Sequence, residues 1–304
     1  MGTPEFAAPA LIALYKNAFN IAMVVTQPDR PKGRGRKFIP SPVKETALSL
    51  GITVAQPETV KTRDFINIIK SIRPDFLVVI AFGHILPDSL LAIPEFGAIN
   101  VHASLLPKYR GPAPIQWAII NEEKETGVTT IKMDKGIDTG DIFLTQKTPV
   151  SIDDNFITLH NRLADMGAAI LLKTLTGIEE GNIHPVTQNH TLATHAPLLK
   201  KNDGHINWNN PAHKIDALIR GIAPWPGAFS FHEGKRLKIL SAKMIEKDFE
   251  DPPGKIINSQ ADELIVATGK GAISILEIQG ESGKPLRIKD FLNGYPLKPG
   301  TQLN

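Results

Sequence analysis

Asn100 and His102 are the first residues whose types and spacing suit catalysis. They end the apolar segment at 97–102 (GAINVH), and residues two apart in a strand project to the same face, so the two side chains should be neighbours. A carboxamide and an imidazole can both donate hydrogen bonds to the oxyanion that forms when a nucleophile attacks an acyl carbon. Taken alone, the pair is better explained as the solvent face of a half-buried strand.

Asp138 is a further candidate, and it lies in the Gly-rich turn KGIDTGD. A carboxylate beside an imidazole can orient the ring, favour its charged form and help to move protons. An aspartate between glycines is, however, more often a turn former than a catalytic group. Asp138 therefore also needs support from the rest of the chain.

A basic loop at 29–37 (DRPKGRGRK) follows a predicted strand and contains one acidic residue. Its proline and glycines exclude a helix or an internal strand. Basic side chains separated by glycine can follow a phosphate backbone, although a solvated surface loop is the simpler explanation for an arbitrary protein. The basic residues of the loop are Arg30, Lys32, Arg34, Arg36 and Lys37.

Length and composition limit the function classes. At 304 residues the chain exceeds the size at which a single core usually stops growing, which favours two domains. We expect no membrane span, no secretory signal and no metal site, since the chain lacks a long apolar run, a basic start and paired histidines. The cysteine count of 0 excludes disulfides and thiolate catalysis. A net charge of +3 only weakly favours a nucleic-acid partner.

The first part of the chain alternates predicted strands and helices, which can position these residues. Apolar runs at 19–26, 75–81 and 97–102 are typical of buried parallel strands, and helical patterns at 43–50 and 62–71 lie between them. This β-α-β-α-β order favours an α/β fold with a Rossmann-like, doubly wound, mostly parallel sheet. Such sheets bind ligands at the carboxyl ends of their strands.

Extended segments are expected at 128–133 and 141–150, on either side of the turn that holds Asp138. A long amphipathic helix follows, and we expect Asp153 or Asp154 to cap its N-terminus. The apolar face of this helix comprises Leu159, Leu163, Met166, Ile170 and Leu171.

The second half of the chain has a different pattern. Polar and turn residues at 184–205 predict a linker, and a helix is expected at 212–222. Closely spaced strands favour a small OB-like β-barrel, in which we expect Trp225 to pack in the core. These strands are predicted at 237–245, 255–258, 264–267 and 272–278. The predicted division is a catalytic domain at 1–183, a linker at 184–205 and an OB-like domain at 206–304.

The segments NVHASLLPKYRGPAPIQWAI and ETGVT…MDKGIDTGDI together resemble the folate-dependent formyltransferases. Within that superfamily the chain is most similar to the methionyl-tRNA formyltransferase family, and the similarity covers essentially the whole chain. It extends to MGTPEFA, TQPDRPKGRGRK, SPVK and IRGIAPWPGAF. The resemblance implies transfer of the formyl group of 10-formyltetrahydrofolate to the α-amino group of methionyl initiator tRNA, giving formylmethionyl-tRNA for translation initiation.

The same resemblance assigns roles to the candidate residues. It makes Asn100, His102 and Asp138 the catalytic positions and places the basic loop on the acceptor arm of the tRNA. The folate is expected to contact Ser104, Leu105, Leu106 and Pro107, and the loop with Phe82, Gly83, Ile85 and Leu86 is expected to enclose its pterin ring. A cytoplasmic monomer without a membrane partner is implied as well.

Two alternatives are kept. A glycinamide ribonucleotide formyltransferase is disfavoured, because it is a one-domain enzyme whose family tends to carry histidine where this chain has Ile131. A formyltransferase acting on a sugar-nucleotide amine does not need the basic loop. A non-catalytic RNA-binding relative does not need the intact catalytic positions.

One departure from the resembling family concerns the first strand. Family members usually carry a short apolar strand before the GTPEF loop, and here the methionine stands directly before that loop. We expect a strand of about five to six residues to be absent from the catalytic domain. A mis-assigned start or a shortened chain is the favoured explanation, and reduced stability is the expected consequence, because neighbouring strands lose backbone partners.

Overall fold

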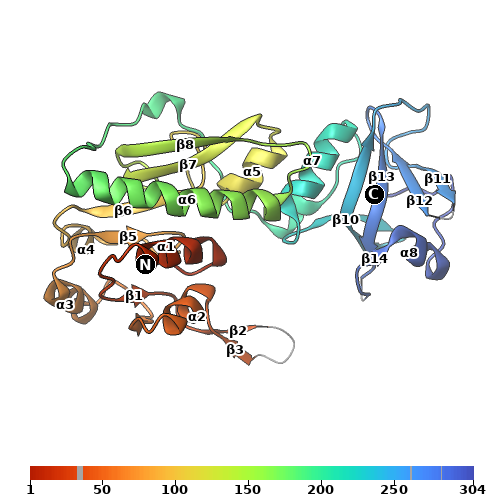
Figure 1. The fold of residues 1–304 in the computed structure, drawn as a ribbon. Helices are drawn as coiled ribbons and strands as arrows, with labels where there is room; N and C mark the ends of the chain where they lie inside the picture. Colours follow the sequence, from red (N-terminus) through yellow and green to blue (C-terminus); the bar gives the residue numbers. More distant parts are fainter. Residues whose placement is uncertain (33–36, 261, 282) are drawn as a thin grey trace. The chain divides into compact units, whose positions relative to one another are not determined.

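The computed structural model describes residues 1–32, 37–260, 262–281 and 283–304. The chain divides into two compact units (Figure 1). Unit 1 consists of Met1–Pro114, Glu125–Pro149 and His160–Pro197, and unit 2 of Ile115–Lys124, Val150–Leu159 and Leu198–Asn304. Within these described ranges, no helix combines the length and the apolar character needed to cross a membrane.

Unit 1 contains a parallel core in two pieces. β1 (Val24–Val25) pairs in parallel with β4 (Val54–Ala55), and β5 (Leu77–Val79) pairs in parallel with β6 (Ala98–His102). The predicted strands at 19–26, 75–81 and 97–102 are therefore confirmed in position, although the first two are shorter than expected. Their burial agrees with the continuous apolar runs that predicted them.

Two long strands extend the second piece. β7 (Glu125–Lys132) runs antiparallel to β6, and β8 (Ile142–Pro149) runs antiparallel to β7, which gives the order β5-β6-β7-β8. The sheet is thus mixed, with parallel strands at its core and antiparallel strands at one side. Because β7 and β8 form a hairpin, the loop between them can fold back over the neighbouring strand.

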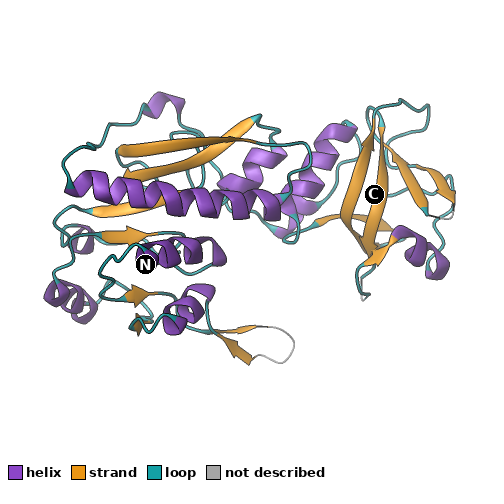
Figure 2. Cartoon of the chain, in the orientation of Figure 1, coloured by secondary structure: helices purple, strands orange, loops and turns teal. Residues whose placement is uncertain are grey.

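Helices lie at Pro42–Ser49 and Arg63–Ile72, where the sequence predicted them at 43–50 and 62–71, whereas the helix at Ala8–Lys16 was not predicted (Figure 2). Ser41 and Thr62 cap their helices by accepting hydrogen bonds from Lys44 N and Phe65 N. Arg73 ends a helix in the left-handed conformation before Pro74, as the proline predicted. The elements are η1 (Glu5–Ala7), α1 (Ala8–Lys16), α2 (Pro42–Ser49), α3 (Arg63–Ile72), α4 (Asp88–Leu91) and η2 (His190–Leu192).

The long helix α6 (Phe156–Glu179) confirms the predicted apolar face but corrects its cap. Leu159, Leu163 and Leu171 are fully buried. The capping residue is Asn155, whose Oδ1 accepts from Ile157 N at 2.9 Å and Thr158 N at 3.1 Å. The buried Asp154 instead accepts from Ser151 N through Oδ2 and from the Thr158 hydroxyl through Oδ1, so its carboxylate joins the preceding turn to α6 without accepting from a helix N–H.

Unit 2 contains an antiparallel sheet of six strands. Five of them have the order β11-β12-β13-β10-β9, and the sixth, β14, pairs with β13. The second β-rich domain is thereby confirmed. Among the described residues β9 and β11 remain edges, so the ladders form an open sheet rather than a closed barrel. The strands are β9 (Ala228–His232), β10 (Lys235–Ile245), β11 (Ile256–Gln260), β12 (Glu263–Ala267), β13 (Ala272–Gln279) and β14 (Leu286–Arg287).

The core of unit 2 forms around α7 (Ala212–Ile222), whose bounds match the prediction. Its apolar face buries Ile215, Ile219 and Ile222. The prediction that Trp225 packs in the core is wrong, because this residue is 53% exposed in a turn rich in proline. The remaining helices in this part are α5 (Pro114–Ile120), η3 (Lys201–Gly204) and α8 (Ile288–Gly294).

The corrected cap of α6 is testable. We expect Asn155→Ala to lower the melting temperature by about 2–4 °C, since losing an N-cap typically costs ~1 kcal/mol. Asp153→Ala is the matched control, because Asp153 is exposed and is not the residue that caps the helix. Calorimetry on both variants measures the melting temperatures. An equal or larger decrease for Asp153→Ala would contradict the assignment of Asn155 as the capping residue.

Candidate active site

The strand β6 positions Asn100 and His102 on one face of the sheet of unit 1. Val101 between them points to the other face, toward α6. A Cβ added at Gly167 of α6 would lie 3.0 Å from Val101 Cγ1, so the absence of a side chain there permits the close packing. The predicted alternation along this strand is thus present, and it leaves Asn100 and His102 free to meet groups from other segments.

The Asp138 carboxylate joins these two side chains. Its Oδ1 lies 3.4 Å from Asn100 Nδ2, which donates to it, and 3.6 Å from His102 Nδ1. Its Oδ2 accepts a hydrogen bond from Gly111 N at 2.8 Å. Residues separated by 38 positions in sequence therefore converge, and both carboxylate oxygens have a donor. The structure brings the three predicted catalytic residues together.

Local turn chemistry holds Asp138 in place. Asp138 has a φ of 53°, in the left-handed region that aspartate tolerates better than most residues. Asp134 Oδ1 accepts from Gly136 N at 3.0 Å and from Thr139 Oγ1 at 2.7 Å, which fixes the turn before it. A Cβ at Gly140 would collide with the Lys132 carbonyl oxygen. Gly140 is thus required by the close approach of the Lys132 backbone.

The His102 ring faces an acceptor at each nitrogen. Nε2 lies 2.8 Å from the Tyr109 carbonyl oxygen, and because a carbonyl only accepts, Nε2 carries a proton. Nδ1 faces the Asp138 carboxylate, so a second proton on the ring would complete an ion pair. The ring is 6% exposed and held in one orientation. Direct donation from Nε2 to a substrate oxygen would require release of the Tyr109 carbonyl.

Sequence reasoning missed two residues behind Asp138. Gln188, which is 4% exposed, donates from Nε2 to the carbonyl oxygens of Asp138 at 2.9 Å and Gly140 at 2.6 Å. Its Oε1 accepts from Arg110 Nη2 at 2.6 Å, and Arg110 also donates to His190 Nδ1 at 2.9 Å. The buried amide therefore holds the catalytic turn by its backbone. Gln188 lies in the segment predicted as a linker, where sequence pattern gave no signal of burial.

The segment that carries Gln188 is tied to the loop after β6 along its length. Arg110 N donates to the Thr194 carbonyl at 2.9 Å, and Ala196 N donates to the Arg110 carbonyl at 2.7 Å. Tyr109 N donates to Thr194 Oγ1 at 2.9 Å. Within unit 1 this part of the chain is thus a strap over the catalytic loop.

The predicted folate residues lie after the carboxyl ends of the adjacent parallel strands β5 and β6, which is one edge of the sheet. The side chains of Ser104, Leu106, Phe82 and Leu86 are buried. Those of Leu105 and Pro107 are partly exposed, and Gly83 and Ile85 are exposed, Ile85 by 66%. The exposed and partly exposed residues can therefore contact a ligand directly, whereas the buried residues pack inside the loops and support them.

Ser104 and Thr129 anchor the first of these loops. Ser104 Oγ donates to the Lys108 carbonyl at 2.6 Å, and Thr129 Oγ1 donates to the Ser104 carbonyl at 2.7 Å. Leu106 N donates to Thr129 Oγ1 at 3.2 Å. The loop is therefore fixed by strand β7 before any ligand binds.

The basic loop begins and ends as a separate hairpin. β2 (Arg30–Lys32) pairs only with β3 (Lys37–Ile39), and Arg30 is exposed. Asp29 at its base accepts from Lys44 Nζ at 2.6 Å and Gln56 Nε2 at 2.8 Å, and these donors lower the pKa of its carboxyl. The predicted Arg34 and Arg36 lie outside the described residues. Within the residues that the structure describes, no ion pair of Arg30 is found, and Asp29 is paired with Lys44.

The site shows no arrangement suited to a metal ion. Throughout the described part of the chain, no group of three or more histidine, aspartate or glutamate side chains could hold one. The side chains of Asn100, His102 and Asp138 can donate hydrogen bonds and transfer protons.

Comparison with known proteins identifies the family of the chain. The formyl transferase family model matches residues 1–175, and the model of the formyl transferase C-terminal domain matches residues 198–296. The chain is 50% identical to the methionyl-tRNA formyltransferase of Caldanaerobacter subterraneus, over 100% of this chain and 98% of that protein. It is 48% identical to that of Citrifermentans bemidjiense, over 99% of this chain and 94% of that protein.

Solved structures share the fold at lower identity. An N-formyltransferase from Helicobacter canadensis, in complex with folinic acid and dTDP-3-aminofucose, has a TM-score of 0.66 at 21% identity, covering 92% of this chain and 97% of that one. HypX from Aquifex aeolicus with tetrahydrofolic acid has a TM-score of 0.61 at 17% identity, covering 86% of this chain and 47% of that one. From the matched models and the full-length relatives, the chain belongs to the formyl transferase family, among the methionyl-tRNA formyltransferases.

Proposed function

We propose that the chain transfers the formyl group of 10-formyltetrahydrofolate to the α-amino group of methionyl initiator tRNA. The observation that carries this proposal is the convergence of Asn100, His102 and Asp138 at one point of the sheet. The full-length relatives named methionyl-tRNA formyltransferase support the acceptor. Initiator tRNA would thereby be prepared for translation initiation.

The reaction needs no covalent enzyme intermediate, because the substrate amine is itself the nucleophile. Free α-amino groups have a pKa of about 7.7–8.0, so a useful fraction is neutral near physiological pH. The amine nitrogen bonds to the formyl carbon, and the bond from that carbon to N10 of the folate breaks. One proton leaves the amine and one proton reaches N10, so the reaction balances without an added reactant.

Asn100 is the proposed donor to the oxyanion. Its Nδ2 has two N–H groups, and one of them points at Asp138 over a long 3.4 Å contact. The other N–H can meet the oxygen of the formyl group as negative charge develops there. Removing one such donor typically costs roughly 2.7–4 kcal/mol of transition-state stabilisation.

Asp138 is the proposed proton carrier. Its carboxylate has Asn100 and His102 on one side and Gly111 N on the other, so it is held in position to accept the amine proton and deliver a proton to N10. His102 supports this role through Nδ1, since a proton there stabilises the ionised carboxylate. The Tyr109 carbonyl keeps the ring in the orientation that this pairing needs.

The folate donor is proposed to lie at the edge formed by the carboxyl ends of β5 and β6. Leu105, Pro107, Gly83 and Ile85 offer surface to it, and the buried residues around them hold the loops. The relatives from Helicobacter canadensis and Aquifex aeolicus have been solved with folate compounds, which supports a folate donor in this fold.

The tRNA partner is proposed to meet the basic hairpin through Arg30, Lys32, Arg34, Arg36 and Lys37. Lys44 and Gln56 hold the base of this hairpin through Asp29. We further propose a catalytic domain at 1–183, a linker at 184–205, and an OB-like domain at 206–304 whose sheet is open at β9 and β11. A cytoplasmic monomer completes the proposal.

A second candidate is formylation of a sugar-nucleotide amine, the reaction suggested by the name of the Helicobacter canadensis relative. It shares the donor and the catalytic residues and differs in the acceptor. The basic hairpin favours a polyanionic acceptor over a small one. A non-catalytic relative would not need Asn100, His102 and Asp138 in contact.

The catalytic assignment can be tested directly. Asn100→Ala should lower kcat for formyl transfer to methionyl initiator tRNA by about 100- to 1,000-fold, through loss of the oxyanion donor. Asp138→Asn should lower it at least as much, since an amide cannot carry the proton. Assays with 10-formyltetrahydrofolate measure both, and Asn155→Ala, at the N-cap of α6, serves as a control that leaves the three catalytic side chains unchanged. Near-normal turnover in either variant would contradict the role assigned to that residue.

Gln188 provides a test of positioning rather than chemistry. Gln188→Glu keeps an acceptor for Arg110 but sets a carboxylate against two carbonyl oxygens, so the Asp138 turn should shift. A displacement of this kind can cost up to about 100-fold in rate, and we expect it in kcat with little change in KM for the folate. Thr187→Ala, at an exposed neighbour, is the control. A change in KM for the folate with an unchanged kcat would argue against a positioning role for Gln188.

The acceptor can be tested at the basic loop. The double variant Arg34→Ala with Arg36→Ala should raise KM for the tRNA with kcat nearly unchanged, and reduce the salt dependence of binding by about one unit per lost phosphate contact. Lys16→Ala, at an exposed lysine on α1, is the control for the loss of one positive charge outside the loop. If the double variant binds tRNA with the native salt slope, the loop does not hold the acceptor.

A further inference from the structure

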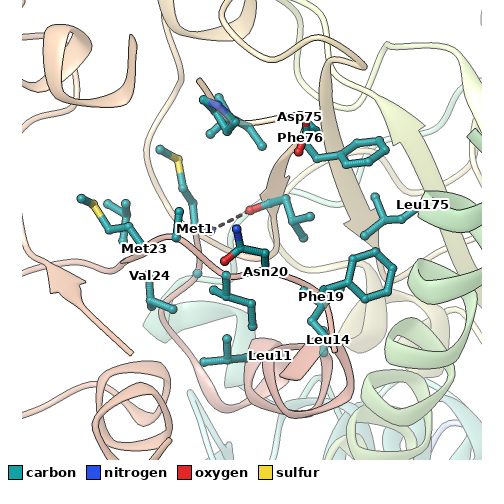
Figure 3. Close-up of a pocket in the computed structure, with 18 of the residues that line it drawn as sticks. Met1, Leu11, Leu14, Phe19, Asn20, Met23, Val24, Asp75, Phe76 and Leu175 are labelled. Carbon is teal, nitrogen blue, oxygen red and sulfur yellow. Dashed lines mark hydrogen bonds between the residues drawn. The ribbon is translucent and has the colours of Figure 1, made fainter. Parts of the chain in front are cut away.

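The segment at 26–29 lies between the basic hairpin and the loop at 82–86, which are two of the proposed substrate surfaces of unit 1. It follows β1 and leads directly into β2. β1 pairs with β4, and a cavity of about 610 Å³, which Met23 and Val24 help to line, borders this strand (Figure 3). Between Thr26 and the start of the hairpin the chain belongs to no strand ladder, so its position depends on side-chain hydrogen bonds.

The first set of these hydrogen bonds holds the base of the hairpin. Thr26 Oγ1 lies 2.7 Å from Ser41 Oγ, just after the hairpin, and Asp29 stands just before it. Gln56 Nε2 donates to Asp29 Oδ1 at 2.8 Å and to the Gln27 carbonyl at 2.9 Å, so one amide group ties the two residues together. Among the described strands β2 pairs only with β3. A ligand that restrains the hairpin therefore also restrains the segment at 26–29.

The second set of hydrogen bonds holds the loop at 82–86. Gln27 Nε2 donates to the Phe82 carbonyl at 3.0 Å. Thr3 Oγ1 donates to the same oxygen at 3.2 Å and accepts from Gln27 N at 3.4 Å. Two neighbouring side chains thus serve two surfaces, since Thr26 contacts the end of the hairpin and Gln27 contacts the loop.

The peptide bond between Phe82 and Gly83 is the part of the loop that Gln27 controls. Gly83 has a φ of 80°, and glycine adopts positive and negative φ with similar ease, so this peptide has two accessible orientations. A Cβ at Gly83 would lie 2.5 Å from Gln27 Nε2, so the absence of a side chain leaves room for the amide. Phe82 is 2% exposed and Ile85 is 66% exposed. The orientation of the peptide therefore sets how the exposed part of the loop is presented.

We propose that Gln27 is a positioning residue that couples folate binding at the loop to acceptor binding at the basic hairpin. This inference rests on the proposed function. The polyanionic acceptor restrains the hairpin and the segment at 26–29, and Gln27 then keeps the Phe82 carbonyl in the orientation that binds the folate. Coupling between two equilibrium binding sites is reciprocal, so each substrate raises the affinity of the chain for the other.

The test measures binding without the reaction. Titration calorimetry gives the Kd of tetrahydrofolate for the full chain, with and without saturating initiator tRNA that carries no methionine. No formyl transfer can occur, because the formyl group and the acceptor amine are both absent. In the native chain we expect the tRNA to lower the Kd of tetrahydrofolate by at least about 5-fold, the lower end of typical coupling between sites.

Two variants separate coupling from a merely structural role. Gln27→Ala should abolish the effect of tRNA on the Kd of tetrahydrofolate, while the Kd for tRNA alone stays nearly unchanged. Gln56→Ala keeps the contact between Gln27 and Phe82 but removes the tie to Asp29, so it should abolish the same effect without changing the Kd of tetrahydrofolate alone. A structural role predicts a higher Kd with and without tRNA and an unchanged ratio. Gln146→Ala, at an exposed glutamine on β8, is the matched control and should keep the native ratio.

Equal Kd values for tetrahydrofolate with and without tRNA in the native chain would overturn the inference. An unchanged ratio in either variant would overturn it as well, and Gln56→Ala alone decides if Gln27→Ala does not fold. Binding of both ligands without coupling leaves the proposed function in place. Failure of the native chain to bind either tRNA or tetrahydrofolate would instead contradict the proposed function and the coupling with it.

Discussion

The catalytic geometry depends on how the Asp138 carboxylate is held against β6. Both of its oxygens have donors, and its own carbonyl is fixed by the buried amide of Gln188. Burying an ionised carboxylate without hydrogen-bond donors costs free energy, and the donors around Asp138 offset that cost. The mixed sheet, the β7–β8 hairpin and the strap through Thr194 all serve to bring these donors to one point.

The parts of the fold that follow from local pattern could be predicted from sequence. The alternation along β6 placed Asn100 and His102 together, and the apolar stripes predicted α6 and α7. The choice among Asp153, Asp154 and Asn155 as cap could not be predicted, since all three residue types cap helices well and only the turn geometry separates them. The open edges of the second sheet are likewise set by long-range pairing that strand patterns do not encode.

The candidate site was predictable to the same extent. Its three central residues lie in segments whose similarity to a known family is long and specific. Gln188 was not found, because polar residues in a turn-rich segment look like a linker when their burial is unknown. Arg110 was not found, because its partner Gln188 is 78 positions away and no local pattern connects the two residues.

The tie between Arg110 and Gln188 spans 78 positions of the chain. Contacts between residues so far apart in sequence form late in folding, because the long intervening loop must first lose conformational entropy. During synthesis, Asn100 and His102 leave the ribosome well before the residue that fixes their carboxylate partner. A nascent chain that ends short of the strap would thus hold a partly built sheet with no ordered catalytic turn. The contacts that hold the Asp138 turn by its backbone can therefore form only after residue 188 has been synthesised.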